Sequence, residues 1–274
     1  MDTIIFIHGA WVTPYCWRYF MPWFAEQGYR LLAPAWPLKD RAICVQEEQP
    51  DPPLAKIGIP EILAHYKRII RSQGQPPILI GHSFGGLIVQ LLLDQGYGGG
   101  GIAICSVPPR GVWALDATSW KSLQLLWTVF GAPTRWPGIL APPEQETDEV
   151  AMLRAQGIEL RLVPESRRIF RQLLRRAAAV DFRNPTRAPL LLVGCGADRA
   201  IPIDVQRRNW ERYRKSRAVT DFALFPSLTH MAIAESGHEA LAAHCLAWIE
   251  DRWGARINPR PTPRPAQTRA AHSN

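Results

Sequence analysis

Short apolar runs alternate with longer amphipathic segments along most of this chain. Six of the runs are short and apolar enough to form strands buried on both faces. Candidate helices lie between them, near residues 17–27, 59–72, 85–94, 205–214 and 239–253. This alternation predicts βαβ units with right-handed crossovers, and therefore an α/β fold with a mostly parallel central sheet. The predicted strands cover residues 3–7, 29–33, 78–81, 101–105, 190–193 and 219–225.

The alternation stops between residues 107 and 186. That segment lacks a strand pattern and carries four tryptophans and several prolines. Because the chain returns to a buried strand near residue 190, we predict a mainly helical lid, residues 107–186, inserted into a core of residues 1–106 and 187–254. The indoles either line an apolar pocket or pack the lid on the core. The pocket candidates are Trp11, Trp113, Trp120, Trp127, Trp136 and Met231.

The net charge of +8 does not indicate a nucleic-acid partner. Half of this net positive charge comes from residues 255–274, which contain four arginines and no acidic residues. Together with four prolines in the same segment, this composition predicts a disordered tail. A second group of arginines, between residues 167 and 176, alternates with apolar residues at helical spacing. That pattern predicts an amphipathic helix whose solvated face is basic.

The cysteines and the first apolar run of the sequence indicate the cellular compartment in which the protein is expected. The five cysteines show no CxxC spacing, so they predict neither a disulfide framework nor a zinc site. The first apolar run lacks a basic region before it and a cleavage site after it, and no stretch reaches the roughly 18 apolar residues of a spanning helix. We therefore expect a cytoplasmic protein without a membrane span.

The sequence Gly-His-Ser-Phe-Gly-Gly at residues 81–86 is the most informative stretch. It follows a predicted buried strand and precedes an apolar helix, which is the context that a nucleophile elbow requires. Gly81 and Gly85 would remove side chains that collide where strand and helix meet. Ser83 is thus the candidate nucleophile, and the alternative is a tight turn that holds a buried serine.

A serine hydroxyl needs a base and an acceptor that orients the base. Asp198 follows the predicted strand 190–193 and His230 follows the last strand, so both belong to strand-end loops on the same edge of the sheet. Asp198 could instead cap the helix that begins near residue 202. His238 and His244 fall at or inside the final helix, from which a side chain cannot easily reach the edge. We therefore predict His230 as the base and Asp198 as the orienting acid.

An oxyanion also needs two amide donors. One is expected from Phe84, the residue after the candidate nucleophile, and the other from the loop after the first strand, which reads His-Gly-Ala-Trp. Ala10 is our first choice for the second donor. This chemistry uses neither a metal ion nor an organic cofactor.

Four motifs follow one another along the chain: the His-Gly loop after the first strand, the elbow around Ser83, Asp198 and His230. With these motifs in this order, residues 1 to about 254 resemble the α/β-hydrolase superfamily. The sequence begins directly at the strand that leads into His8-Gly9, without the opening β-hairpin of many members. In this respect it resembles the branch of the superfamily that contains plant esterases and hydroxynitrile lyases. Ser83 stands where haloalkane dehalogenases and epoxide hydrolases have an aspartate. Met231 and Gly9 stand where hydroxynitrile lyases have a lysine and a threonine. These departures disfavour those three chemistries.

The resemblance implies hydrolysis of a small, largely apolar carboxylic ester. A lactone, a thioester or a carbon–carbon bond next to a ketone could be cleaved by the same residues. A further alternative is a receptor that binds a small molecule without converting it. The expected partner is a small ester-like molecule, and a second copy of this chain, forming a homodimer, is a candidate partner.

Overall fold

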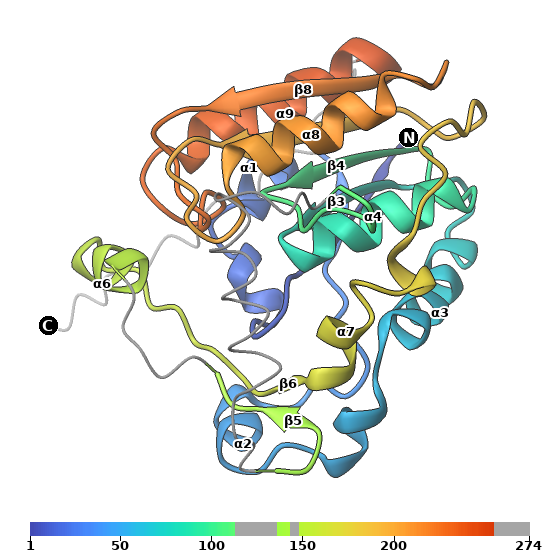
Figure 1. Cartoon of the computed structure of the whole chain (residues 1–274). Coiled ribbons are helices and arrows are strands. Elements are labelled where there is room, and N and C mark those ends of the chain that lie inside the picture. The colour runs from blue at the N-terminus through green and yellow to red at the C-terminus, as the bar shows by residue number, and fades with distance from the viewer. Residues whose placement is uncertain (113–135, 143–147, 255–274) are drawn as a thin grey trace, which may run out of the picture.

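A computed structural model describes residues 1–112, 136–142 and 148–254 of the chain. Six parallel strands form the central sheet in the order β2-β1-β3-β4-β7-β8 (Figure 1). This sheet confirms the predicted α/β fold. The predicted tail and Trp113, Trp120 and Trp127 lie outside the described residues. The strands are β1 (Thr3–Ile7), β2 (Arg30–Leu32), β3 (Ile78–His82), β4 (Gly100–Ile104), β7 (Leu190–Cys195) and β8 (Thr220–Phe225).

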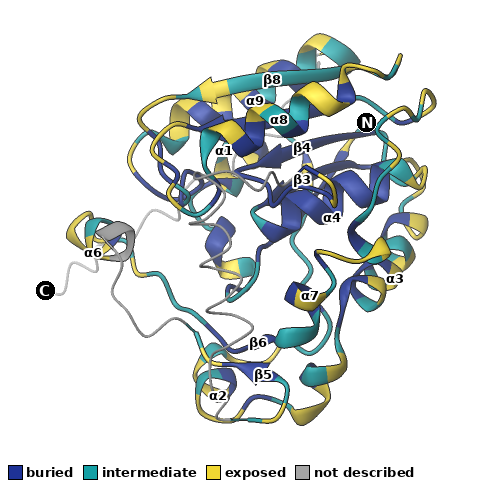
Figure 2. Ribbon diagram, viewed as in Figure 1, coloured by how far each residue is buried: buried dark blue, intermediate teal, exposed yellow. Residues whose placement is uncertain are grey.

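Helices cover both faces of the sheet, so its central strands are buried on each side (Figure 2). In β1, Ile4 and Phe6 belong to one apolar cluster and Ile5 and Ile7 to another, as expected from side chains that alternate along a strand. One face packs against α3, α4 and α8, and the other against α1 and α9 (Figure 1). No helix among the described residues is long and apolar enough to cross a membrane. These helices are α1 (Met21–Glu26), α3 (Ile59–Arg71), α4 (Phe84–Asp94), α8 (Ile203–Tyr213) and α9 (His238–Trp253).

The strand order reverses direction at β1. From β1 the chain passes to β2 on one side, and β3 then pairs with the opposite side of β1. The helices that follow β1 and β3 therefore lie on opposite faces of the sheet. Ligands in open parallel sheets bind at the carboxyl edge where the strand order reverses in this way. The loop after β1 contains Ala10, and the turn after β3 contains Ser83.

The predicted helix at residues 17–27 is wrong in its extent. The structure has a 3-10 helix, η1 (Pro14–Trp17), followed by the separate helix α1 from Met21. Pro22 explains the break, because a proline lacks an amide hydrogen and is tolerated only in the first turn of a helix. Helix α2 (Ile43–Glu48) and the 3-10 helix η2 (Pro52–Lys56) were not predicted.

The segment between β4 and β7, called the insertion below, contains a small antiparallel pair that the sequence pattern did not predict. Strand β5 (Ile139–Leu140) pairs with β6 (Glu165–Ser166), beside η2. Two-residue strands are too short for a periodic pattern. The described helical elements are α6 (Asp148–Ala155), α7 (Arg167–Arg171) and η3 (Arg176–Ala178). The predicted basic helix thus ends at Arg171, and Leu174 is exposed.

Candidate active site

Ser83 occupies a strained turn between β3 and α4. Its φ of 55° and ψ of −119° lie outside the regions that side-chain-bearing residues usually adopt. A Cβ on Gly81 would lie 2.2 Å from the Gly85 carbonyl oxygen, and a Cβ on Gly85 would lie 2.0 Å from the Ile7 carbonyl oxygen. The two glycines therefore allow β3, α4 and β1 to meet closely enough to hold the serine at the sheet edge.

His230 connects Ser83 to Asp198. Its Nε2 lies 2.9 Å from Ser83 Oγ, and its Nδ1 lies 2.9 Å from Asp198 Oδ2. An ionised carboxylate only accepts hydrogen bonds, so Nδ1 carries the proton and Nε2 presents its lone pair to the serine hydroxyl. The Asp198 side chain is fully buried, whereas that of His230 is 14% exposed. The structure thus brings together the three residues that the sequence singles out.

Asp198 does not cap α8, the alternative role that its position allowed: Pro202 is the N-cap residue of that helix, and no side chain caps it. Its second oxygen, Oδ1, accepts hydrogen bonds from the amides of Ala200 and Ile201, each at 2.8 Å. The two carboxylate oxygens therefore have separate partners, the imidazole on one side and the loop that enters α8 on the other. These bonds fix the carboxylate plane toward His230.

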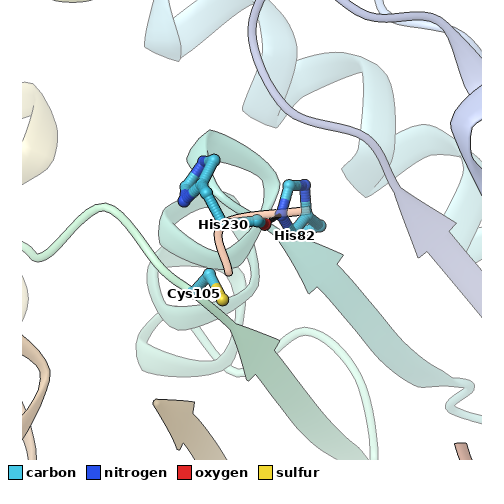
Figure 3. A group of neighbouring side chains, drawn as sticks. All are labelled: His82, Cys105 and His230. Carbon is cyan, nitrogen blue, oxygen red and sulfur yellow. Dashed lines mark hydrogen bonds between the residues drawn. The ribbon is translucent and has the colours of Figure 1, made fainter. Parts of the chain in front are cut away.

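Two side chains from neighbouring strand ends hold the His230 loop. His82 Nε2 donates to the His230 carbonyl at 2.6 Å (Figure 3). Cys105 Sγ donates to the Thr229 carbonyl at 3.7 Å. Burial, together with the nearby His230, lowers the pKa of His82 to about 3, so this imidazole stays neutral. Glu235, also buried, accepts from the amide and the hydroxyl of Thr229.

His82, Cys105 and His230 also place potential metal-ligand atoms within 4.8 Å of one another. The hydrogen bonds of this cluster argue against a metal site. His82 Nε2 and Cys105 Sγ donate to carbonyls, and both ring nitrogens of His230 have partners in Ser83 and Asp198. Sequence reasoning missed Cys105 and Glu235, because neither belongs to a recognisable motif.

The two predicted amide donors border Ser83. Phe84 begins α4, and the first amides of a helix have no partner inside it. None of the hydrogen bonds in the described part of the chain uses the Ala10 amide. Ala10 follows Gly9, where a Cβ would lie only 3.1 Å from Ser83 Cβ, so this loop passes directly beside the serine.

The remaining predicted pocket residues occupy different places. Trp11 is half-buried, and its ring centroid lies 4.7 Å from that of Phe170, which in turn contacts the ring of Phe84 at 5.9 Å. Met231 is buried directly after His230. Trp136 is half-buried and bridges to Ile139 at the start of β5, which lies apart from the central sheet (Figure 1). Phe170 was missed, although its apolar position on the predicted basic helix marked it as inward-facing.

Comparison with known proteins agrees with this fold. The model of the alpha/beta hydrolase family matches residues 4–244, and the chain belongs to that family. A search of curated proteins found no match.

Solved structures that share the fold include a metagenome-derived lipolytic enzyme, with 16% identity, a TM-score of 0.64, and coverage of 91% of this chain and 93% of that one. A methylesterase from Arabidopsis has 17% identity, a TM-score of 0.62, and coverage of 92% and 100%. A pyrethroid hydrolase from Sphingobium faniae has 18% identity, a TM-score of 0.59, and coverage of 91% and 97%.

Proposed function

We propose that this protein is a serine hydrolase that cleaves a small, largely apolar carboxylic ester through an acyl-enzyme intermediate. The observation that carries the proposal is the continuous hydrogen-bonded path from Asp198 through His230 to Ser83, with both links at 2.9 Å. A nucleophile, a base and a group that orients the base are the parts that acyl transfer needs.

In the proposed reaction, Ser83 Oγ attacks the ester carbonyl while His230 Nε2 takes the hydroxyl proton. The negative charge that develops on the carbonyl oxygen is stabilised by the amides of Phe84 and Ala10. His230 then gives its proton to the alcohol oxygen as the carbon–oxygen bond breaks. In the second half, His230 takes a proton from water as the water oxygen attacks the acyl carbon. The bond between that carbon and Ser83 Oγ then breaks, His230 returns the proton to Oγ, and the carboxylic acid product leaves.

The surroundings of Ser83 favour an apolar substrate. Residues 8–13, the loop after β1 that contains Ala10, are called the oxyanion loop. The aromatic rings of Trp11, Phe170 and Phe84 follow one another beside it, and Met231 directly follows the base. Structural neighbours named as a lipolytic enzyme, a methylesterase and a pyrethroid hydrolase agree with an ester as the reacting group.

The proposal is tested by turnover of p-nitrophenyl esters with acyl chains of two to eight carbons. Purified wild-type protein is expected to release p-nitrophenol catalytically, and Ser83→Ala to lose at least about 10³-fold in rate. Thiophenyl esters and lactones assayed in parallel would distinguish the related acyl substrates. A folded wild-type protein that binds these esters without converting them would contradict the proposal and favour a receptor.

A further inference from the structure

A buried ion pair joins the insertion to the core beside the oxyanion loop. Lys39 follows β2, and Glu165 begins β6. Lys39 Nζ lies 2.5 Å from Glu165 Oε2, and neither side chain is exposed to solvent. Burying two charges is expensive, and a buried pair is weak evidence for stability alone. The pair therefore calls for a role beyond holding the two segments together.

Both members of the pair contact the backbone of the oxyanion loop. Glu165 Oε2 accepts a hydrogen bond from the Trp11 amide at 3.3 Å, and Lys39 Nζ donates to the Val12 carbonyl at 3.4 Å. The insertion makes a third contact here, because the Val163 amide donates to the Trp11 carbonyl at 2.7 Å. Trp11 has a φ of 59°, a left-handed conformation that persists only when its surroundings determine it.

The other end of the loop is fixed from the core. His8 Nε2 accepts from the Trp36 amide at 3.1 Å, which leaves Nδ1 protonated to donate to the Gly9 carbonyl at 2.8 Å. Burial, with a smaller contribution from the charge of Lys39, lowers the pKa of His8 to about 3, so this arrangement is insensitive to mild acid. The loop is thus held on both sides of Ala10.

We propose that Lys39 and Glu165 are positioning residues that orient the Ala10 amide toward the oxyanion. The insertion would then complete the reaction centre through the backbone, in addition to any contact it makes with substrate. This inference rests on the proposed function. Glu165 suits the role because its other oxygen, Oε1, accepts from the Ser166 amide at 2.8 Å, which restrains the carboxylate against rotation.

Two double variants test the hydrogen-bond acceptor that Glu165 provides. Lys39→Met with Glu165→Gln removes both charges but keeps a side-chain oxygen that can accept from the Trp11 amide. Lys39→Met with Glu165→Leu removes both charges and the acceptor. Neither leaves an unpaired buried charge, so they differ in the side-chain oxygen at position 165 that can accept from the amides of Trp11 and Ser166.

The expected result is a kcat about 10-fold to 100-fold lower in the Leu double variant than in the Gln double variant, with a much smaller change in KM. This range is below the roughly 10²- to 10³-fold effect of deleting a whole oxyanion donor, because the donor is misplaced and not removed. The Leu double variant should also bind a boronic acid inhibitor less tightly by a similar factor. Arg161→Ala, which breaks another ion pair between the insertion and the core (Arg161 with Glu47), is the matched control and should keep wild-type kcat and KM.

Equal kcat values for the two double variants, corrected for the folded fraction, would overturn the positioning role while leaving the proposed function intact. Hydrogen–deuterium exchange of the peptide that covers residues 8–13 gives a second readout, and exchange should be faster in the Leu double variant. Equal exchange in the two variants would also overturn the role. An inactive wild-type protein would instead refute the proposed function, and the positioning role with it.

Discussion

His230→Ala is expected to lower the turnover of a p-nitrophenyl ester by about 10⁴-fold or more, measured as kcat in steady state. The reason is that His230 Nε2, 2.9 Å from Ser83 Oγ, is the group placed to take the hydroxyl proton. His82, the other histidine near the serine, cannot replace it. Its Nε2 is used on the His230 carbonyl, and its pKa is lowered to about 3.

His244→Ala is the matched control for this experiment. His244 is exposed on α9 and was a rival candidate in the sequence, so its variant should keep full activity. Circular dichroism and thermal unfolding should show that both variants are folded. Activity of the His230 variant within a few fold of the wild type would refute His230 as the base.

Asp198→Asn is expected to lower kcat by about 10⁴-fold with little loss of stability. The asparagine oxygen can still accept from the amides of Ala200 and Ile201, as Asp198 Oδ1 does now. Its nitrogen would face His230 Nδ1 and, being a donor, would favour the tautomer that carries the proton on Nε2. The imidazole would then present a proton to Ser83 where a lone pair is needed.

Asp198→Ala separates the two roles of this carboxylate. It should lose the same activity and, in addition, about 1–3 kcal/mol of unfolding free energy, which is typical when buried hydrogen-bond donors lose their acceptor. Asp204→Asn is the control, because Asp204 is an exposed acid in the first turn of α8. If the Asp198→Asn variant turned over ester at the wild-type rate, another group would have to orient the imidazole.

The sheet and the three meeting side chains were predictable because they follow from local patterns. Each central strand is a short apolar run, and the glycines around Ser83 mark a junction that only a close strand–helix crossing requires. Chain order then places the ends of β3, β7 and β8 on one edge of the sheet. Asp198 and His230 needed only their positions after the strands β7 and β8. The prediction that all six strands are buried on both faces was wrong for β2 and β8, whose residues are half-buried or exposed because these strands form the two edges of the sheet.

The contacts that tune the site were not predictable in the same way. Lys39 and Glu165 are 126 residues apart, and no sequence pattern pairs them. The short strands β5 and β6 have no detectable periodicity, so the partner of the Trp11 amide could not be identified. Trp11 was predicted as a pocket residue because of its indole side chain, whereas it is the backbone amide of Trp11 that donates a hydrogen bond to Glu165 of the insertion. Such details depend on how distant segments pack.

The central claim is that Ser83 is the activated nucleophile, and fluorophosphonate labelling followed by peptide mass spectrometry tests it most directly. We predict one covalent adduct per molecule, located on the peptide that contains Ser83, absent from Ser83→Ala and formed much more slowly by His230→Ala. A folded wild-type protein that stays unlabelled, or that carries the adduct on a different residue, would contradict the account.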